Sequence, residues 1–248
     1  MQLPFFYIGS IDSPTKTIIL DEETSRYVVQ VLRMKKGEKI NLTDGKGNLL
    51  TAEIILDHKK HCEVKVIDSS LPTPSASASG GLQRDSRLIT IAISLLKNTT
   101  RFEWFLEKAT EIGVYQIIPL ICERTEKQKF RFDRMQQICI SAMLQSRQCW
   151  LPVLHKPVAF QLLFRQLEIA NADQKFIAHC IEGEKRSSLN SNTPLSRHSL
   201  ILIGPEGDFS KEEIELATQY NFIPVSLGAT RLRSETAGVV AAVLLRHI

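Results

Sequence analysis

The stretch Leu200-Ile-Leu-Ile-Gly-Pro-Glu-Gly-Asp-Phe-Ser210 decides the fold, because it combines a buried strand, a glycine-containing loop and the start of a helix. Four apolar residues at 200–203 are typical of a strand covered on both faces. Gly204 and Gly207 leave room for a ligand close to the backbone, and Ser210 with Glu213 has the spacing of a capping box. Ligands of open α/β sheets bind at the carboxyl ends of strands. Taken alone, the stretch is equally consistent with a tight turn between a strand and a helix.

A second glycine-containing loop follows the same plan at Leu227-Gly-Ala-Thr-Arg-Leu-Arg-Ser-Glu-Thr-Ala237. Two such loops at strand ends in one half of a chain favour a ligand site over two unrelated turns. Arg231 and Arg233 are suited to bind phosphate groups through paired hydrogen bonds. Helix capping accounts for Ser234 and Glu235, but it gives no reason for two arginines beside a glycine.

Around these loops, residues 82–248 alternate between short apolar segments and longer segments with helical periodicity. This alternation predicts an α/β domain with a parallel sheet. The predicted strands are 88–95, 117–121, 176–179, 200–203 and 225–227, and the predicted helices begin near 100, 133, 210 and 234. Thr100 and Glu103 have the spacing of a capping box, and Gly113 marks the end of that helix.

Residues 1–70 have a different pattern, in which apolar residues alternate on both sides of the turn Asp44-Gly-Lys-Gly47. The pattern predicts a β-hairpin, which further short strands extend to a small β-barrel with one helix at 24–32. The segment 71–81 is rich in proline, serine and glycine, has no charge and is typical of a linker. We therefore predict domains at 1–70 and 82–248, joined by a linker at 71–81.

The composition is that of a globular chain: of 248 residues, 43% are apolar and 23% are charged, and the net charge is +4. It excludes collagen-like, disulfide-scaffold and wholly disordered classes. The apolar run at 239–245 is much shorter than the ~20 residues of a membrane span, and residues 1–10 lack the basic start of a secretory signal. We therefore expect a cytoplasmic protein that does not enter a membrane. Five widely spaced cysteines predict buried, reduced thiols and no metal site.

Several familiar motifs are absent from the sequence. It contains no G-x-x-x-x-G-K-[ST], no G-x-G-x-x-G and no G-x-S-x-G, so neither a P-loop, a standard dinucleotide site nor a nucleophile elbow is indicated. Of the six histidines, His179 is the one that we place near a pocket, because it follows a predicted strand.

The motifs and their order resemble the ribosomal RNA small-subunit methyltransferase E family of the SPOUT superfamily, and the resemblance spans nearly the whole chain. In the first domain it rests on Val31-Leu-Arg-Met34, Gly37 and the turn at 44–47. In the second domain it rests on Lys97, Glu103-Trp104, 108–113, Gln145-Ser146, 203–210 and 227–237. Several motifs in the expected succession are far more specific than any one of them.

The resemblance implies a PUA-like β-barrel for the first domain. For the second domain it implies a SPOUT α/β fold whose carboxyl-terminal chain forms a trefoil knot. It further implies S-adenosylmethionine as the cofactor and a homodimer with the active site near the subunit interface. The implied reaction is methylation of uridine N3 in the 16S ribosomal RNA of the small ribosomal subunit.

The loops that hold the cofactor in this family match the stretches 203–207 and 227–233. With His179 added from the neighbouring strand end, the predicted cofactor-binding residues are His179, Ile203, Gly204, Glu206, Gly207, Leu227, Gly228, Leu232 and Arg233. Arg233 is the candidate for stabilising the anion that develops on uracil, and Glu206 is the candidate base or cofactor contact. The predicted RNA-binding residues are Arg33, Lys35, Lys36 and Arg231.

Three other functions stay open at this point. The chain is also compatible with a SPOUT methyltransferase that acts on another RNA position or on transfer RNA. A second alternative is an RNA-binding assembly factor without catalysis, against which the two close-approach loops argue. A third is a nucleotide-binding protein unrelated to RNA, which should prefer a dinucleotide to S-adenosylmethionine.

Overall fold

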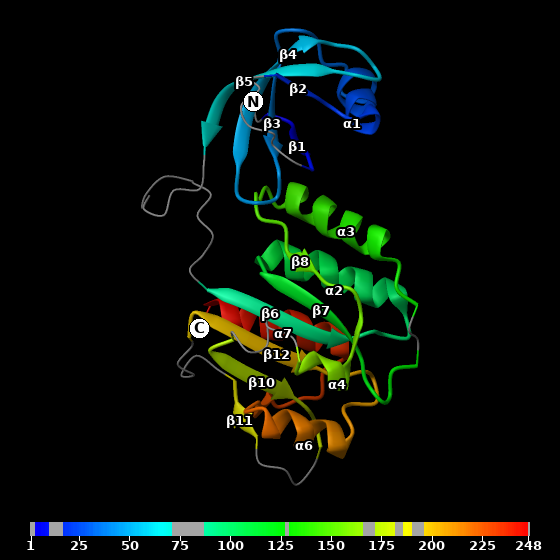
Figure 1. Cartoon of the computed structure of the whole chain (residues 1–248), viewed down its shortest axis with the longest axis vertical. Coiled ribbons are helices and arrows are strands. Elements are labelled where there is room, and N and C mark those ends of the chain that lie inside the picture. The colour runs from blue at the N-terminus through cyan, green and yellow to red at the C-terminus, as the bar shows by residue number, and fades with distance from the viewer. Residues whose placement is uncertain are drawn as a thin grey trace. The chain divides into compact units, whose positions relative to one another are not determined.

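The computed structural model describes residues 3–9, 17–70, 87–126, 129–165, 172–181, 186–189 and 196–247. The chain divides into two compact units (Figure 1). Unit 1 comprises residues 1–84 and 143–151, and unit 2 comprises residues 85–142 and 152–248. The predicted linker at 71–81 lies outside the described residues. The sequence prediction assigned 143–151 to the second domain, whereas the structure places this segment in unit 1.

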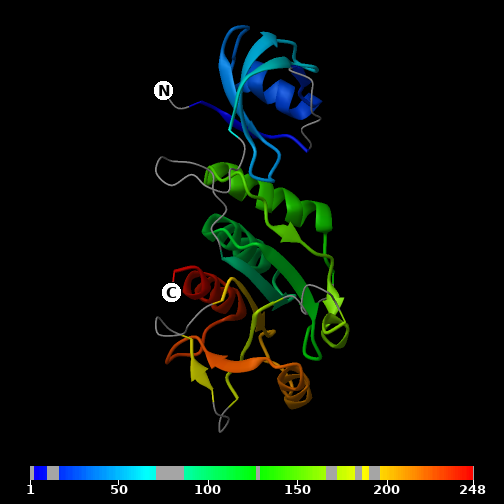
Figure 2. The same cartoon turned by 60° about the vertical axis from the view of Figure 1, so that its left-hand side comes forward.

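Unit 1 is built on a five-stranded sheet in the order β1-β3-β4-β5-β2. Its strands are β1 (Phe5–Tyr7), β2 (Thr17–Ile19), β3 (Lys39–Thr43), β4 (Leu49–Leu56) and β5 (Glu63–Ser70). β3 and β4 pair antiparallel, which confirms the predicted hairpin. The pairing of β4 with β5 contains two register shifts, and such irregularities bend and twist a strand. The sheet curls around the helical segment of the unit (Figure 2).

The helical segment of unit 1 has two parts, the α-helix α1 (Glu22–Arg26) and the π-helix η1 (Tyr27–Val31). The Asp21 side chain caps α1 and fixes its start. The Leu32 N–H then bonds to the Tyr27 carbonyl, five residues back, at 2.9 Å. A helical segment therefore lies where the sequence predicts one, although it begins at Glu22 and its second part is a π-helix.

The turn between β3 and β4 packs against residues 149–151, which explains why this segment belongs to unit 1. The Gly47 N–H donates to the Cys149 carbonyl at 2.7 Å, and the Leu151 N–H donates to the Gly45 carbonyl at 2.8 Å. A Cβ on Gly47 would overlap the ring of Trp150, and Gly47 has a φ of +96°. Only glycine adopts this positive φ without strain and also leaves room for the Trp150 ring.

Unit 2 is built on a sheet in the order β11-β13-β10-β12-β6-β7-β8, with β9 also paired to β7. Every one of these pairs is parallel, as the sequence predicts. The strands are β6 (Leu88–Ser94), β7 (Gln116–Ile121), β8 (Val153–Leu154), β9 (Val158–Ala159), β10 (Gln174–Ala178), β11 (Ser187–Ser188), β12 (His198–Ile203) and β13 (Ile223–Ser226).

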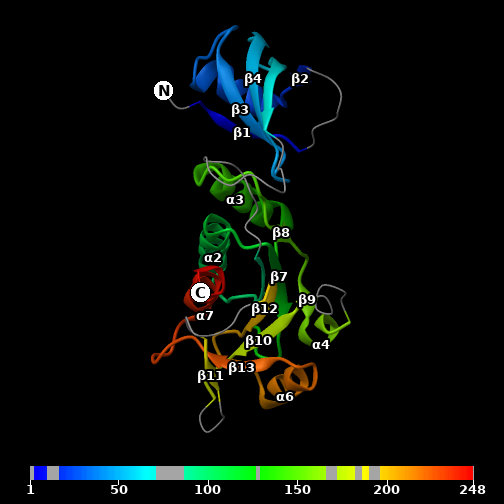
Figure 3. The same ribbon diagram turned by 90° about the vertical axis from the view of Figure 1, so that its left-hand side faces the viewer.

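Helices cover both faces of this sheet. They are α2 (Thr99–Ile112), α3 (Phe132–Gln145), α4 (Phe160–Leu163), α6 (Lys211–Gln219) and α7 (Ser234–His247). Figure 3 shows α2 and α7 on one face and α4 and α6 on the other. Gly238 allows α7 to approach the core closely, because a Cβ there would lie 2.6 Å from the Phe105 ring. Within the described residues, none of the helices combines the length and the apolar character that crossing a bilayer requires.

The two predicted capping boxes have different outcomes. Ser210 and Glu213 form the predicted box at the start of α6. At the start of α2, the predicted box of Thr100 and Glu103 is wrong, because the Asn98 side chain is the cap and accepts from the Thr100 N–H at 2.9 Å. Asparagine is among the strongest N-cap residues, so the helix begins two residues earlier than the box requires.

Candidate active site

The ends of three adjacent strands, β10, β12 and β13, surround a cavity of about 860 Å³ in unit 2. The strands are parallel, so their carboxyl ends meet at one edge of the sheet, where ligands of open α/β sheets bind. The volume lies in the range of about 300–1,000 Å³ that is typical of small-molecule sites. The lining comes from residues 178–180, 203–206, 208 and 225–234, together with Arg186 and Ala237.

The loop after β12 forms one wall of the cavity. Gly204 follows the strand directly, and a Cβ at this position would lie 3.1 Å from both the backbone nitrogen and the ring of Phe209. Phe209 is fully buried, so it has little room to move away. Glycine is therefore required where the chain folds back on itself, and Gly204 is a buried residue in the lining of the cavity.

The loop after β13 forms the opposite wall, from Leu227 to Arg233. Gly228 has a φ of +146°, a conformation that residues with side chains rarely adopt, and a Cβ here would meet nothing within 4 Å. Glycine is therefore favoured at position 228 by the backbone conformation and not by close packing. The loop ends where α7 begins, and the Ala237 N–H donates to the Arg233 carbonyl at 2.7 Å.

Asp208 ties the loop after β12 to the end of β10. Its Oδ2 accepts from the Cys180 N–H at 2.7 Å, and its Oδ1 accepts from the Phe209 N–H at 2.8 Å. Asp208 also has a φ of +66°, which is uncommon outside glycine. His179, buried beside Cys180, offers its carbonyl to Arg186 Nη1 at 2.5 Å. These bonds hold the two strand exits in fixed positions.

The charge around the cavity is biased toward positive. Arg186, Arg231 and Arg233 line it, against the carboxylates of Glu206 and Asp208. Three guanidinium groups against two carboxylates give the lining a net charge of +1, and the Asp208 carboxylate is engaged by two backbone N–H groups. Such a site favours a substrate that carries phosphates.

Two further loops support the wall that contains Glu206. The Lys97 N–H donates to Glu206 Oε1 at 3.1 Å, and Lys97 Nζ lies 2.7 Å from Glu126 Oε2. This hydrogen bond with Glu126 raises the pKa of the Lys97 ammonium. Arg124 donates from Nη1 to the Gly207 carbonyl at 2.7 Å. The loops after β6 and β7 thus fix the loop after β12 from outside the cavity.

The structure brings most of the predicted cofactor residues together. His179, Ile203, Gly204, Glu206, Leu227, Gly228, Leu232 and Arg233 all line the cavity. Gly207 does not line it, because this residue packs against the side chain of Arg124. Arg231, predicted to bind RNA, lines the same cavity, whereas Arg33, Lys35 and Lys36 are exposed in unit 1.

Sequence reasoning missed several lining residues. Cys180 and Asp208 adjoin predicted site residues, and the adjacency of β10 to β12 would have revealed both. Arg186 had no local signal, because it reaches the site only through the bond to the carbonyl of His179. The contact of Arg124 with Gly207 joins residues 83 positions apart, so no local sequence pattern could predict it.

Two family models match the chain. A model described as an RNA methyltransferase domain matches residues 83–246, and one described as an RNA methyltransferase PUA domain matches residues 20–67. These matches correspond to the cavity-bearing sheet of unit 2 and to the curled sheet of unit 1.

Individual relatives agree with the family models. The ribosomal RNA small subunit methyltransferase E of Synechocystis sp. is 30% identical over 236 residues, which are 91% of this chain and 71% of that protein. The crystal structure of a probable rRNA-methyltransferase from Porphyromonas gingivalis is 36% identical, with a TM-score of 0.81 and coverage of 97% of this chain and 95% of that one. A ribosomal RNA small subunit methyltransferase E from Neisseria gonorrhoeae, crystallised with S-adenosyl methionine, is 27% identical, with a TM-score of 0.76 and coverage of 97% and 95%.

Proposed function

Because the chain belongs to the ribosomal RNA small subunit methyltransferase E family of RNA methyltransferases, we propose that it transfers a methyl group from S-adenosylmethionine to the RNA of the small ribosomal subunit. The observation that carries the proposal is the cavity at the strand ends, with a glycine loop on each side. Its residues come from the two stretches at which the sequence resembles the cofactor loops of this family.

The residues of the cavity fit this cofactor. Ile203, Leu227 and Leu232 offer apolar side chains to a flat adenine ring, and Gly204 and Gly228 line the cavity beside them. The volume of about 860 Å³ also leaves room for the end of an RNA substrate. When bound, S-adenosylmethionine supplies an electrophilic methyl group on a positively charged sulfur.

The proposed acceptor is N3 of a uridine. This nitrogen carries a weakly acidic proton, so transfer requires that the proton leave and that the resulting charge on the uracil oxygens be stabilised. Arg233 is exposed at the edge of the cavity and carries a permanent positive charge suited to this task. Holding the base in line with the methyl group supplies a further large part of the rate.

Glu206 is the proposed base or cofactor contact. Its Oε1 accepts from the Lys97 N–H, which holds the carboxylate at the edge of the cavity. A proton from the substrate would then be taken up at Oε2. The bond to Lys97 also supports a positioning role for Glu206, and the two roles differ in their pH dependence.

The proposal extends to the partners of the protein. Arg33, Lys35 and Lys36 in unit 1 and Arg231 beside the cavity are proposed to contact RNA phosphates. We also propose a cytoplasmic homodimer. Exposed apolar side chains on the packed helices α2 and α7, Trp104 and Val243, support a second copy there. The trefoil knot implied by the resemblance stays a prediction.

Calorimetric titration with S-adenosylhomocysteine, the product of methyl transfer, tests the cofactor site without RNA. We expect binding that is lost when Gly204 or Gly228 is replaced by valine in a folded protein. Incubation with S-adenosylmethionine and unmethylated small-subunit RNA, followed by mass spectrometry of the nucleosides, then identifies the acceptor. If a nucleoside other than N3-methyluridine is found, the acceptor is a different atom and the assignment of uridine N3 is wrong. Binding of RNA without any methyl transfer would indicate an assembly factor.

Two variants test the assigned roles. Arg233→Ala should lower the rate of transfer with RNA and S-adenosylmethionine both saturating, and an unchanged rate would overturn the role of Arg233. Glu206→Gln should flatten the acidic limb of the pH–rate profile if Glu206 is the base. A lower affinity for S-adenosylhomocysteine with an unchanged profile would instead identify it as a cofactor contact.

A further inference from the structure

The end of the helical segment in unit 1 presents a small apolar surface to solvent. The π-helical bond from the Leu32 N–H to the Tyr27 carbonyl places Tyr27, Val31 and Leu32 on the same side of the turn. Their relative exposures are 49%, 60% and 39%, whereas Val28 is fully buried. We call Tyr27, Val31 and Leu32 the apolar platform. π-helical turns occur frequently at functional sites.

The ring of Tyr27 packs against one other aromatic ring. It meets Phe6 edge to face, with ring centroids 6.2 Å apart and an interplanar angle of 72°. This contact with Phe6 restricts the positions that the Tyr27 ring can take. A half-exposed aromatic ring on the same side of the turn as two aliphatic side chains offers an apolar surface of about the size of one nucleotide base.

The residue after the platform is held in an unusual conformation. Arg33 has a φ of +57°, in the left-handed region that glycine prefers. The backbone on both sides fixes it there, since Leu32 bonds to Tyr27 and the buried Met34 donates its N–H to the Val28 carbonyl at 3.0 Å. This left-handed residue ends the helical segment, and its exposed side chain directly follows the platform.

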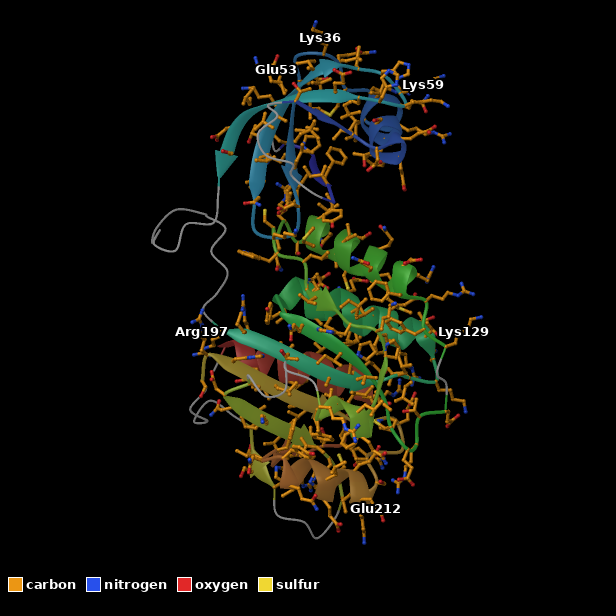
Figure 4. All side chains as sticks on the ribbon, viewed as in Figure 1. Lys36, Glu53, Lys59, Lys129, Arg197 and Glu212 are labelled. Carbon is orange, nitrogen blue, oxygen red and sulfur yellow. The ribbon has the colours of Figure 1, made fainter. Side chains whose placement is uncertain are left out.

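Positive charge gathers at the same end of the segment. Asp21, Glu22 and Glu23 lie at the start of α1, whereas Arg33, Lys35 and Lys36 follow the end of η1. Two carboxylates lie beside Lys35: its Nζ is 3.6 Å from Asp57 Oδ2, and its backbone N–H donates to Glu38 Oε2 at 2.6 Å. Among the described residues, no carboxylate oxygen lies within 4.0 Å of the charged nitrogens of Arg33 or Lys36. Lys36 points outward from the loop (Figure 4).

We propose that the apolar platform stacks one unpaired base of single-stranded RNA, and that Arg33 and Lys36 hold the adjoining phosphates. Aromatic side chains beside cations are the usual means by which proteins bind unpaired bases. A protein partner fits less well, because a stable interface buries about 800 Å² on each side and the platform has three side chains. The proposal rests on the proposed function only in taking RNA as the substrate.

Tyr27→Ala tests the platform. The probe is a single-stranded RNA of about 12 nucleotides without internal pairing, and its affinity is measured by fluorescence anisotropy. We expect Tyr27→Ala and Tyr27→Leu to weaken binding about tenfold, and Tyr27→Phe to retain the affinity of the wild type. Tyr27→Leu keeps an apolar contact with Phe6 and guards against loss of folding in the alanine variant. Ile67→Ala, which removes another exposed apolar side chain of unit 1, from β5, is the matched control.

A base analogue and a strain-free variant give independent readouts. The fluorescence of 2-aminopurine in the same RNA should be quenched by the wild type and less quenched by Tyr27→Leu, because stacking causes the quenching. Arg33→Gly should leave thermal stability unchanged or higher, since glycine adopts this φ freely, while it weakens RNA binding and lowers its salt dependence.

The outcomes separate this proposal from the proposed function. Wild-type affinity and quenching in Tyr27→Leu, with methylation of small-subunit RNA intact in the wild type, would overturn the platform alone. Absence of RNA binding and of methylation in the wild type would overturn both. If Tyr27→Leu changes the oligomeric state in light scattering and not the RNA affinity, the platform is a contact between copies and the stacking proposal fails.

Discussion

The Arg124 guanidinium donates from Nη1 to the Gly207 carbonyl at 2.7 Å, across 83 residues of sequence. The aliphatic carbons of the same side chain pack where a Cβ of Gly207 would point, with Cδ 3.3 Å away. Arg124 therefore holds the outer side of the loop whose inner side, at Gly204 and Glu206, lines the cavity. An exposed residue outside the cavity thus fixes one of its walls.

Arg124→Met should weaken binding of S-adenosylhomocysteine about tenfold, which corresponds to about 1.4 kcal/mol. The variant keeps the aliphatic packing but removes a charge-assisted hydrogen bond to the backbone, and such bonds contribute about 1.5–3 kcal/mol. Calorimetric titration measures the loss. Lys129→Met removes an exposed positive charge elsewhere in unit 2 and should have no effect (Figure 4). Equal affinities of Arg124→Met and the wild type would show that the loop holds its shape without this bond.

The sequence predicted the cavity walls because their signals are local. A strand, a glycine and a capping residue follow one another within 200–210, and the box of Ser210 and Glu213 formed as predicted. The same pattern failed at Thr100, because Asn98 lies two residues upstream and is the stronger competitor for the cap. A local pattern is reliable only where no neighbouring residue offers the backbone a better partner.

The remaining features could not be predicted because they depend on distant contacts. The segment 149–151 joins unit 1 through backbone bonds to Gly45 and Gly47, about 100 residues earlier in the chain. The apolar periodicity near Tyr27 does not distinguish a helix with bonds four residues apart from one with bonds five residues apart. The positions of Arg124 and Arg186 likewise follow from the adjacency of strands, which a single sequence does not contain.

Gly47→Ala should displace Trp150 from the turn between β3 and β4. The variant combines a strained backbone at φ +96° with overlap of the new Cβ and the Trp150 ring. Gly37→Ala is the matched control, because Gly37 has a φ of +92° but nothing lies within 4 Å of its Cβ position. We expect about 1 kcal/mol of destabilisation for Gly37→Ala, from strain alone, and a further ~1–3 kcal/mol for Gly47→Ala.

Urea unfolding followed by the fluorescence of Trp150 measures this difference. The background is Trp104→Phe, which removes the second of the two tryptophans. A shifted emission maximum in folded Gly47→Ala, and not in Gly37→Ala, would locate the effect at the ring. Equal destabilisation of the two variants would show that segment 149–151 can move away from the new methyl group without lowering the free energy of unfolding.

Cys180 should be the fast-reacting thiol of the native protein. It is exposed and lines the cavity, so the prediction that all five thiols are buried is wrong for Cys180 and right for Cys62, Cys122, Cys139 and Cys149. Burial raises the pKa of the Cys62 and Cys139 thiols to about 11, so almost none of either is thiolate at pH 8. Titration with a thiol reagent should therefore show one fast phase, which Cys180→Ser removes.

The same thiol reports on the cavity. Saturating S-adenosylhomocysteine should slow the fast phase at least several-fold, because a ligand in the cavity covers a lining residue. The slow phases, from the buried thiols, should change little and provide the internal control. A fast phase that keeps its rate under saturation would place the bound ligand away from Cys180.

Glu103 and Arg134 join α2 to α3 through a bidentate pair, with 2.5 Å between Nε and Oε1 and 2.9 Å between Nη2 and Oε2. These hydrogen bonds hold the pKa of the Glu103 carboxyl below its ordinary value. The carboxylate is therefore more stable as an anion in the folded protein than in the unfolded chain. Its contribution is fully present above the unfolded pKa of about 4.3 and is lost as the pH falls through the lower folded pKa.

Glu103→Gln should accordingly lower the free energy of unfolding at pH 7, and the difference from the wild type should shrink as the pH falls below about 4. Urea unfolding at a series of pH values measures the difference. The double variant with Arg134→Gln completes a thermodynamic cycle and isolates the pair from other effects of either change. A difference that stays constant from pH 7 to pH 3 would mean that the substitution acts through the helix itself and not through loss of the ionised pair.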